Sequence, residues 1–272
     1  MSINKEIMKL EAEKFLKTLF VLPEIKRIFI KNIEISNIDD EESIEKSLSL
    51  CYHDNLSDID LTAEVYVSYE DYKDTEPFYK KYFSRLGMKD EIFSIYFINK
   101  RDKNEDVLRI CLKNGIRIDF TCILYSTKEA SCLEYVNDKQ DIFENDVDRI
   151  NQFFFIAVQA LGKLYRKDYL IADHLAHMLI MEGLVLQMEE RDKKTNTKFH
   201  RYGYSEELEY RNVTVKEPFF LTSDDTFNDI ADRIYRAVVA YDNLSLKLNK
   251  KYISKMDIFF NIWKGYLNKE TL

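Results

Sequence analysis

One stretch decides how the first half of the chain is interpreted, and it reads Asn55-Leu56-Ser57-Asp58-Ile59-Asp60-Leu61-Thr62. It opens a β-rich run, and side chains two residues apart on a strand point to the same face. We therefore expect Asp58 and Asp60 on one face, with Ile59 and Leu61 turned toward a core. Adjacent carboxylates repel each other unless a cation lies between them, and Mg²⁺ takes such oxygen ligands. The alternative is a solvated strand edge that carries two ordinary aspartates.

A third carboxylate, Asp119, lies on a predicted hairpin. Residues 107–123 form two alternating runs around Asn114-Gly115, which is the strongest short hairpin signal because both turn residues must tolerate positive φ. Asp119 falls on the polar face of the second run, and a lone aspartate within a strand is costly in a core unless it is paired or binds a metal. Both interpretations stay open: Asp119 is a metal ligand, or it is neutralised by Arg109 or Arg117.

Three carboxylates on neighbouring strands could support phosphoryl chemistry. They could hold two Mg²⁺ ions on a nucleoside triphosphate for in-line attack, and the ions would neutralise charge on the phosphoryl oxygens. The third carboxylate could also accept the proton of an acceptor hydroxyl.

The composition is that of a folded protein with an acidic balance. The 272 residues are 46% hydrophobic, which is enough for a sizeable core and two domains. A net charge of −8 disfavours a nucleic-acid partner and suits a cationic small molecule. The sequence has no apolar run of membrane-spanning length, no signal-peptide pattern, and four cysteines without metal-ligand spacing. We therefore expect a cytoplasmic protein with no membrane partner.

Two motifs carry a resemblance to a known family. Residues 57–61, Ser-Asp-Ile-Asp-Leu, and residues 116–120, Ile-Arg-Ile-Asp-Phe, together resemble the core of the nucleotidyltransferase superfamily related to DNA polymerase β. Within it the chain is most similar to the aminoglycoside and lincosamide nucleotidyltransferases, which modify antibiotics. The likeness extends to residues 149–155, 166–172 and 198–203, which are similar to parts of that group's helical domain.

The resemblance implies a set of functional residues. Asp58 and Asp60 would bind Mg²⁺, and Asp119 would act as a metal ligand or general base. The family has a Gly-Ser pair after the preceding strand, whereas this chain has no glycine before Gly87. Alignment on the strand 28–30 puts Lys31 and Asn32 in that place, while alignment by distance from Asp58 puts Lys46 and Ser47 there. We prefer the strand alignment, and expect nucleotide contacts from three residues: Lys31, Asn32 and Ser57.

The second half of the chain reads as helical, with apolar residues at helical spacing over 154–165 and 227–238. The segment 169–188 is apolar almost all round and should be central in a bundle, and 189–198 reads as a charged connection. On its most apolar segment, 169–188, three polar residues lie along one side, because positions three and four apart are neighbours on a helix: Asp173, His174 and His177. They form either an acceptor-binding or base-supplying face, or a polar patch in which Asp173 orients His177.

Together these observations predict an α+β protein. Residues 1–145 would form a nucleotidyltransferase domain, a mixed β-sheet with helices, and residues 146–272 an α-helical bundle. The expected function is Mg²⁺-dependent transfer of a nucleoside monophosphate, AMP from ATP or the equivalent from another nucleoside triphosphate, to a hydroxyl of an aminoglycoside-like small molecule. The alternative is a catalytically degenerate protein of the same fold that acts in binding or regulation, as an antitoxin does.

Overall fold

The computed structural model describes residues 5–37, 39, 41–51, 58–67, 89–100, 104–126, 146–196 and 226–267. The chain divides into two compact units, Met1–Asp148 and Arg149–Leu272. Among the described residues the first unit holds a sheet with helices and the second holds only helices, which together make an α+β protein, as predicted. The functional domains 1–145 and 146–272 stay a prediction.

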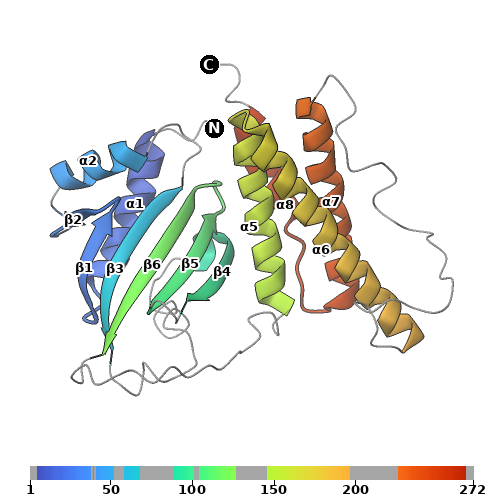
Figure 1. The fold of residues 1–272 in the computed structure, drawn as a ribbon, viewed down its shortest axis with the longest axis horizontal. Coiled ribbons are helices and arrows are strands. Elements are labelled where there is room, and N and C mark those ends of the chain that lie inside the picture. Colours follow the sequence, from blue (N-terminus) through green and yellow to red (C-terminus); the bar gives the residue numbers. More distant parts are fainter. Residues whose placement is uncertain are drawn as a thin grey trace. The chain divides into compact units, whose positions relative to one another are not determined.

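Within the described residues of the first unit, six strands form one mixed sheet in the order β2-β1-β3-β6-β5-β4 (Figure 1). Strands β3 and β6 are parallel, and every other neighbouring pair among these strands is antiparallel. The strands are β1 (Ile25–Ile30), β2 (Ile33–Ile35), β3 (Ile59–Val67), β4 (Ile92–Lys100), β5 (Glu105–Leu112) and β6 (Arg117–Ser126).

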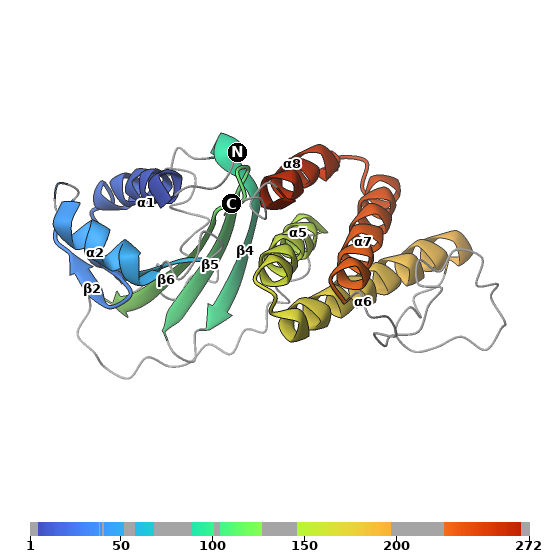
Figure 2. The same ribbon diagram turned by 90° about the horizontal axis from the view of Figure 1, so that it is seen from above.

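Helices α1 (Lys5–Phe20) and α2 (Glu41–Cys51) share one core with the sheet (Figure 2). In α1 the buried side chains recur three and four residues apart, which is the stripe that a helix lays on a sheet. The core includes Met8, Phe15 and Leu19 of α1, Ile44 and Leu48 of α2, and Ile59, Leu61, Ile118 and Phe120 of the sheet.

The opposite face of the sheet, which we call the second face, carries the polar side chains. Buried and less buried residues alternate along β3, so Ile59 and Leu61 enter the core and Asp60 points to the second face. The predicted alternation is confirmed there. Asp58 lies immediately before the first residue of β3 and is half-buried.

The predicted hairpin is confirmed as the antiparallel pair β5 and β6, but its turn differs from the expected one. Only Gly115 of the two turn residues has a positive φ, of 85°. Gly115 N donates to the carbonyl of Leu112, and Leu112 N donates to the carbonyl of Ile116. The loop therefore spans three residues, in the form of a type I turn followed by a glycine bulge.

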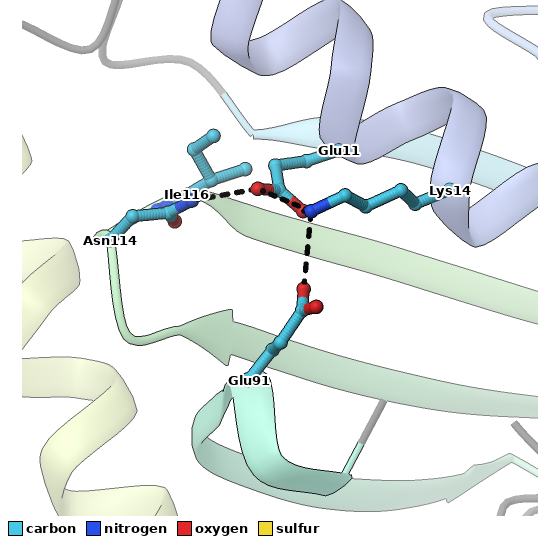
Figure 3. A network of polar contacts seen from close by, with 5 residues as sticks. All are labelled: Glu11, Lys14, Glu91, Asn114 and Ile116. Carbon is cyan, nitrogen blue, oxygen red and sulfur yellow. Dashed lines mark hydrogen bonds and ion pairs between the residues drawn. The ribbon is translucent and has the colours of Figure 1, made fainter. Parts of the chain in front are cut away.

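Polar contacts attach this turn to the first helix (Figure 3). The Asn114 side-chain amide donates to Oε1 of the buried Glu11, over 3.1 Å. Lys14 lies 3.4 Å from the same carboxylate and 3.6 Å from Glu91 of the short helix η1 (Lys89–Glu91). Because the buried charge of Glu11 has both a cation and an amide as partners, its burial is compensated.

The second unit comprises, among its described residues, α5 (Asp146–Tyr165), α6 (Tyr169–Thr195), α7 (Thr226–Leu248) and α8 (Met256–Leu267). Aromatic rings fill the space between them. Phe153 of α5 stacks on Tyr241 of α7 with ring centroids 3.6 Å apart, and Phe154 meets Phe259 of α8 edge to face. The helical half is thus confirmed, while the topology of a bundle stays a prediction.

Helix α6 differs from the prediction in its length and burial. The charged residues after Met188 continue the helix to Thr195, because Glu, Arg and Lys are good helix formers and Lys194 pairs with Glu190 one turn away, over 3.0 Å. Its apolar side chains are not all internal, since Leu170 is 85% exposed and Met181 is 53% exposed.

Helix α6 also bears on the expected absence of a membrane span. By length and composition alone it could cross a membrane, contrary to the sequence-based expectation. The core helix of a soluble protein passes the same test, so the observation is weak evidence for a span. The cytoplasmic location stays a prediction.

Candidate active site

The parallel pairing of β3 with β6 brings two of the predicted aspartates together. Asp60 and Asp119 are direct partners in the register, so their side chains leave neighbouring strands on the second face. The register persists along both strands, and six residues further on Tyr66 stacks on Tyr125 with ring centroids 5.1 Å apart. The sequence motifs therefore meet as the predicted carboxylate pair.

Each of the three carboxylates forms an ion pair with a basic side chain. Lys31 Nζ contacts Asp60 Oδ2, and Arg117 Nη2 contacts Asp58 Oδ1. Arg109 Nε lies 3.3 Å from Asp119 Oδ2.

These contacts show which of the two candidate arginines pairs with Asp119. Its basic neighbour is Arg109, the directly opposite residue on β5. Arg117 lies on the same strand as Asp119 but is almost fully buried and pairs with Asp58. Whether Asp119 also binds a metal stays a prediction.

Lys31 reaches Asp60 because of the turn that follows β1. Ile30 pairs with Leu61 on β3, which puts the next residue of β1 beside the preceding residue of β3. Lys31 and Asn32 form the two-residue turn into β2, with φ of 47° and 68°. Positive φ at both positions is the mark of the tight hairpin turn that matches strand twist.

This turn bears on the two alignments of the phosphate-binding pair. The preferred one puts Lys31 and Asn32 directly after a strand, and this is where the structure has them. The alternative, Lys46 and Ser47, lies within helix α2, where Ser47 is buried and donates to the carbonyl of Ser43 over 2.5 Å. Ser57, the remaining predicted nucleotide contact, lies outside the described residues.

The site raises the proton affinity of one carboxylate. Burial of Asp119 raises its pKa from 3.8 to about 6, against the lowering effect of the Arg109 charge. The neighbouring charges of Asp58 and Asp60 raise the pKa of Asp119 further. Asp119 thus exchanges its proton near neutral pH, whereas an exposed aspartate is ionised well below it.

The donor chemistry of these residues fits a hard divalent ion. All three supply carboxylate oxygens, and Asp119 Oδ1 is buried without a hydrogen bond from any described residue. In the described part of the chain no three acidic, histidine or cysteine side chains are arranged closely enough to hold a metal. The basic partners, Lys31 above all, would have to give way before an ion could bind.

Tyr96 is the site residue that the sequence did not reveal. It lies opposite Arg109 on β4, and Arg109 Nη1 donates to its hydroxyl over 2.8 Å. Four residues on four adjacent strands therefore follow one another across the second face, and we call them the acidic row: Tyr96, Arg109, Asp119 and Asp60. The signal in the sequence was the alternation of β4, but alternation does not give the register.

The polar residues of α6 form a separate cluster in the second unit. Asp173 Oδ1 accepts a hydrogen bond from Arg233 of α7 over 2.6 Å. His177 Nδ1 lies 2.9 Å from the carbonyl oxygen of Asp173 and 3.4 Å from its carboxylate. His174 is exposed. The interpretation in which Asp173 orients His177 agrees with these contacts, and the sequence did not reveal Arg233.

Comparison with known proteins gives little to add. No protein-family model matches the chain, and no curated protein matches it. Among solved structures, an aminoglycoside 6-adenyltransferase from Bacillus subtilis aligns with 95% of this chain and 98% of its own, at 13% identity and a TM-score of 0.25. A likeness at that TM-score carries no argument about fold or activity.

Proposed function

We propose that the chain is a nucleotidyltransferase that uses Mg²⁺ to transfer AMP from ATP, with release of pyrophosphate, to a hydroxyl of a small cationic molecule of the aminoglycoside kind. The register of β3 on β6 carries this proposal, because it sets Asp60 directly beside Asp119. Asp60 and Asp119 lie on adjacent strands, and Asp58 precedes Asp60 by two residues. Carboxylates of this kind are the donors that two-ion phosphoryl transfer requires.

The residues have distinct roles in this reaction. Asp58 and Asp60 would hold Mg²⁺, which supplies neutralisation of charge on the phosphoryl oxygens when bound. Asp119 would take the proton of the acceptor hydroxyl, and a pKa of about 6 suits a general base at neutral pH. Lys31 would leave Asp60 and contact a phosphate, a movement that its exposed side chain permits.

The proposed chemical class of the acceptor follows from the net charge of the chain. The chain carries a formal net charge of −8, so a cationic acceptor is attracted where a polyanion is repelled. ATP enters with its own cation, which offsets the repulsion of the donor. We place the reaction in the cytoplasm, where cysteines such as Cys111 and Cys122 stay reduced.

One observation favours a second candidate, a nucleotidyltransferase-like protein without catalysis that binds or regulates a partner. Every predicted metal ligand already has a basic partner: Lys31 for Asp60, Arg117 for Asp58, and Arg109 for Asp119. An ion-paired carboxylate binds a metal more weakly, since the ion has to displace a cation. On this candidate the carboxylates stabilise the fold.

Isothermal titration of ATP and of GTP, each with and without Mg²⁺, separates the two. The nucleotidyltransferase requires ATP binding that depends on Mg²⁺ and is lost in Asp58→Ala. The matched control is Glu64→Ala, since Glu64 lies on β3, the strand that Asp58 immediately precedes, and pairs with Arg27 instead. No binding at millimolar ATP, or equal binding by Asp58→Ala, would refute the proposed activity and leave the second candidate.

A further inference from the structure

The acidic row contains one connection that simple charge neutralisation does not require. The guanidinium of Arg109 donates from Nη1 to the Tyr96 hydroxyl over 2.8 Å, and its Nε lies 3.3 Å from Asp119 Oδ2. It therefore connects β4 to β6 by way of β5. A positive charge near Asp119 needs only one of these two contacts.

The surroundings hold the guanidinium in one orientation. Tyr96 is 7% exposed, and its ring lies beside the guanidinium, with 5.8 Å between the ring centroid and Cζ of Arg109. A guanidinium is planar with its donors in fixed directions, so a contact at Nη1 sets the direction of Nε as well. The contact of Nε with Asp119 Oδ2 is an ion pair and not a hydrogen bond, so through Arg109 the Tyr96 hydroxyl sets the position of the positive charge that faces the Asp119 carboxylate.

We propose that Arg109 is a positioning residue for Asp119, and that Tyr96 holds Arg109 in place. The inference rests on the proposed function, in which Asp119 is a metal ligand or general base. With Oδ2 directed at Arg109, the buried Oδ1 accepts no hydrogen bond from a described residue and is kept for a cation or for the acceptor hydroxyl. Residues that orient metal ligands in this way raise metal affinity without touching the metal.

Two conservative variants test orientation apart from charge. Tyr96→Phe keeps the buried ring and removes only the hydroxyl. Arg109→Lys keeps the positive charge, but a single ammonium cannot reproduce the two-directional contact of a guanidinium. The matched control is Arg27→Lys, since Arg27 lies on the same face of β1 and pairs with Glu34 and Glu64 outside the acidic row.

The experiment measures Mn²⁺ binding to the full chain with saturating ATP, by electron paramagnetic resonance, beside ATP affinity and melting temperature. We expect Tyr96→Phe and Arg109→Lys each to weaken Mn²⁺ binding by about tenfold or more. ATP affinity and melting temperature should stay near those of the unchanged protein, and Arg27→Lys should match it throughout. A merely structural role would lower the melting temperature and weaken ATP binding together.

The outcomes distinguish this inference from the function on which it rests. If the unchanged protein binds Mn²⁺ and ATP and both variants bind them equally well, Arg109 does not position Asp119, and the proposed function stands. If Arg27→Lys weakens Mn²⁺ binding as much as the row variants, the effect is not specific and the inference also fails. If the unchanged protein binds no Mn²⁺ with ATP, the proposed function fails and the inference falls with it.

Discussion

Replacing Asp119 with Asn should change how stability depends on pH. Asp119 is a carboxyl whose burial favours the protonated form, so the folded protein keeps the proton to a higher pH than the unfolded chain does. Asparagine has a similar shape and does not titrate. The difference between the two proteins therefore isolates the contribution of this one proton.

The size of the effect follows from the two pKa values. The pKa of Asp119 is about 6 in the folded protein and 3.8 ordinarily, a difference of about 2.2. One pKa unit corresponds to about 1.4 kcal/mol, so ionisation of Asp119 removes about 3 kcal/mol of stability. Between these two values the folded state binds more protons than the unfolded state, so stability falls as pH rises. The loss is complete above about pH 6.

Urea unfolding followed by circular dichroism, without divalent ions, measures this difference across pH 4 to 8. Relative to the unchanged protein, Asp119→Asn should gain about 2.4 kcal/mol between the two ends of the range, because at pH 4 an aspartate of the unfolded chain is already more than half ionised. Asp90→Asn, an exposed aspartate of η1, serves as the control and should run parallel to the unchanged protein. Parallel curves for Asp119→Asn would show that burial does not govern this carboxyl, and would refute the reasoning about its proton.

Three further predictions concern stability and binding. Asp242→Ala should cost about 3 kcal/mol of stability in thermal or urea unfolding. This buried carboxylate accepts hydrogen bonds from the Tyr252 hydroxyl, the Ser254 hydroxyl and the Lys255 backbone amide. An unchanged melting temperature would contradict the prediction. Phe153→Ala should cost about 3–5 kcal/mol in the same assay, since it removes a fully buried ring stacked on Tyr241, while Phe153→Leu should cost less. Lys31→Met should tighten Mn²⁺ binding in the absence of nucleotide by freeing Asp60, yet weaken ATP binding. Changes of the same sign in both titrations would contradict the proposed movement of Lys31.

The sequence predicted those features that depend on local pattern. The alternation around Ile59 and Asp60 gave the strand and its two faces, because the side-chain period of a strand is fixed. The hairpin that carries Asp119 followed from Asn114-Gly115, although three loop residues replace the expected two. The apolar stripes of α5 and α7 predicted helices for the same reason.

Which strands pair, and in which register, could not be predicted from the local pattern of the sequence. Arg109 and Arg117 were equal candidates for Asp119, and only the register of β5 on β6 decides between them. Tyr96 was missed because nothing in its neighbourhood marks it as the partner of Arg109. The end of α6 was missed because its charged last turns read as a connection, although they are good helix formers with a pair one turn apart.

The turn at Lys31 and Asn32 has a consequence for engineering. Both residues adopt the left-handed backbone that glycine enters without cost, whereas a residue with a Cβ such as lysine carries about 1–2 kcal/mol of strain there. Glycine at either position is therefore compatible with the existing strands β1 and β2. A Lys31→Gly/Asn32→Ser chain would open the end of β1 to close backbone approach by an anion such as phosphate. The backbone at this corner therefore accommodates a glycine although the chain carries none there.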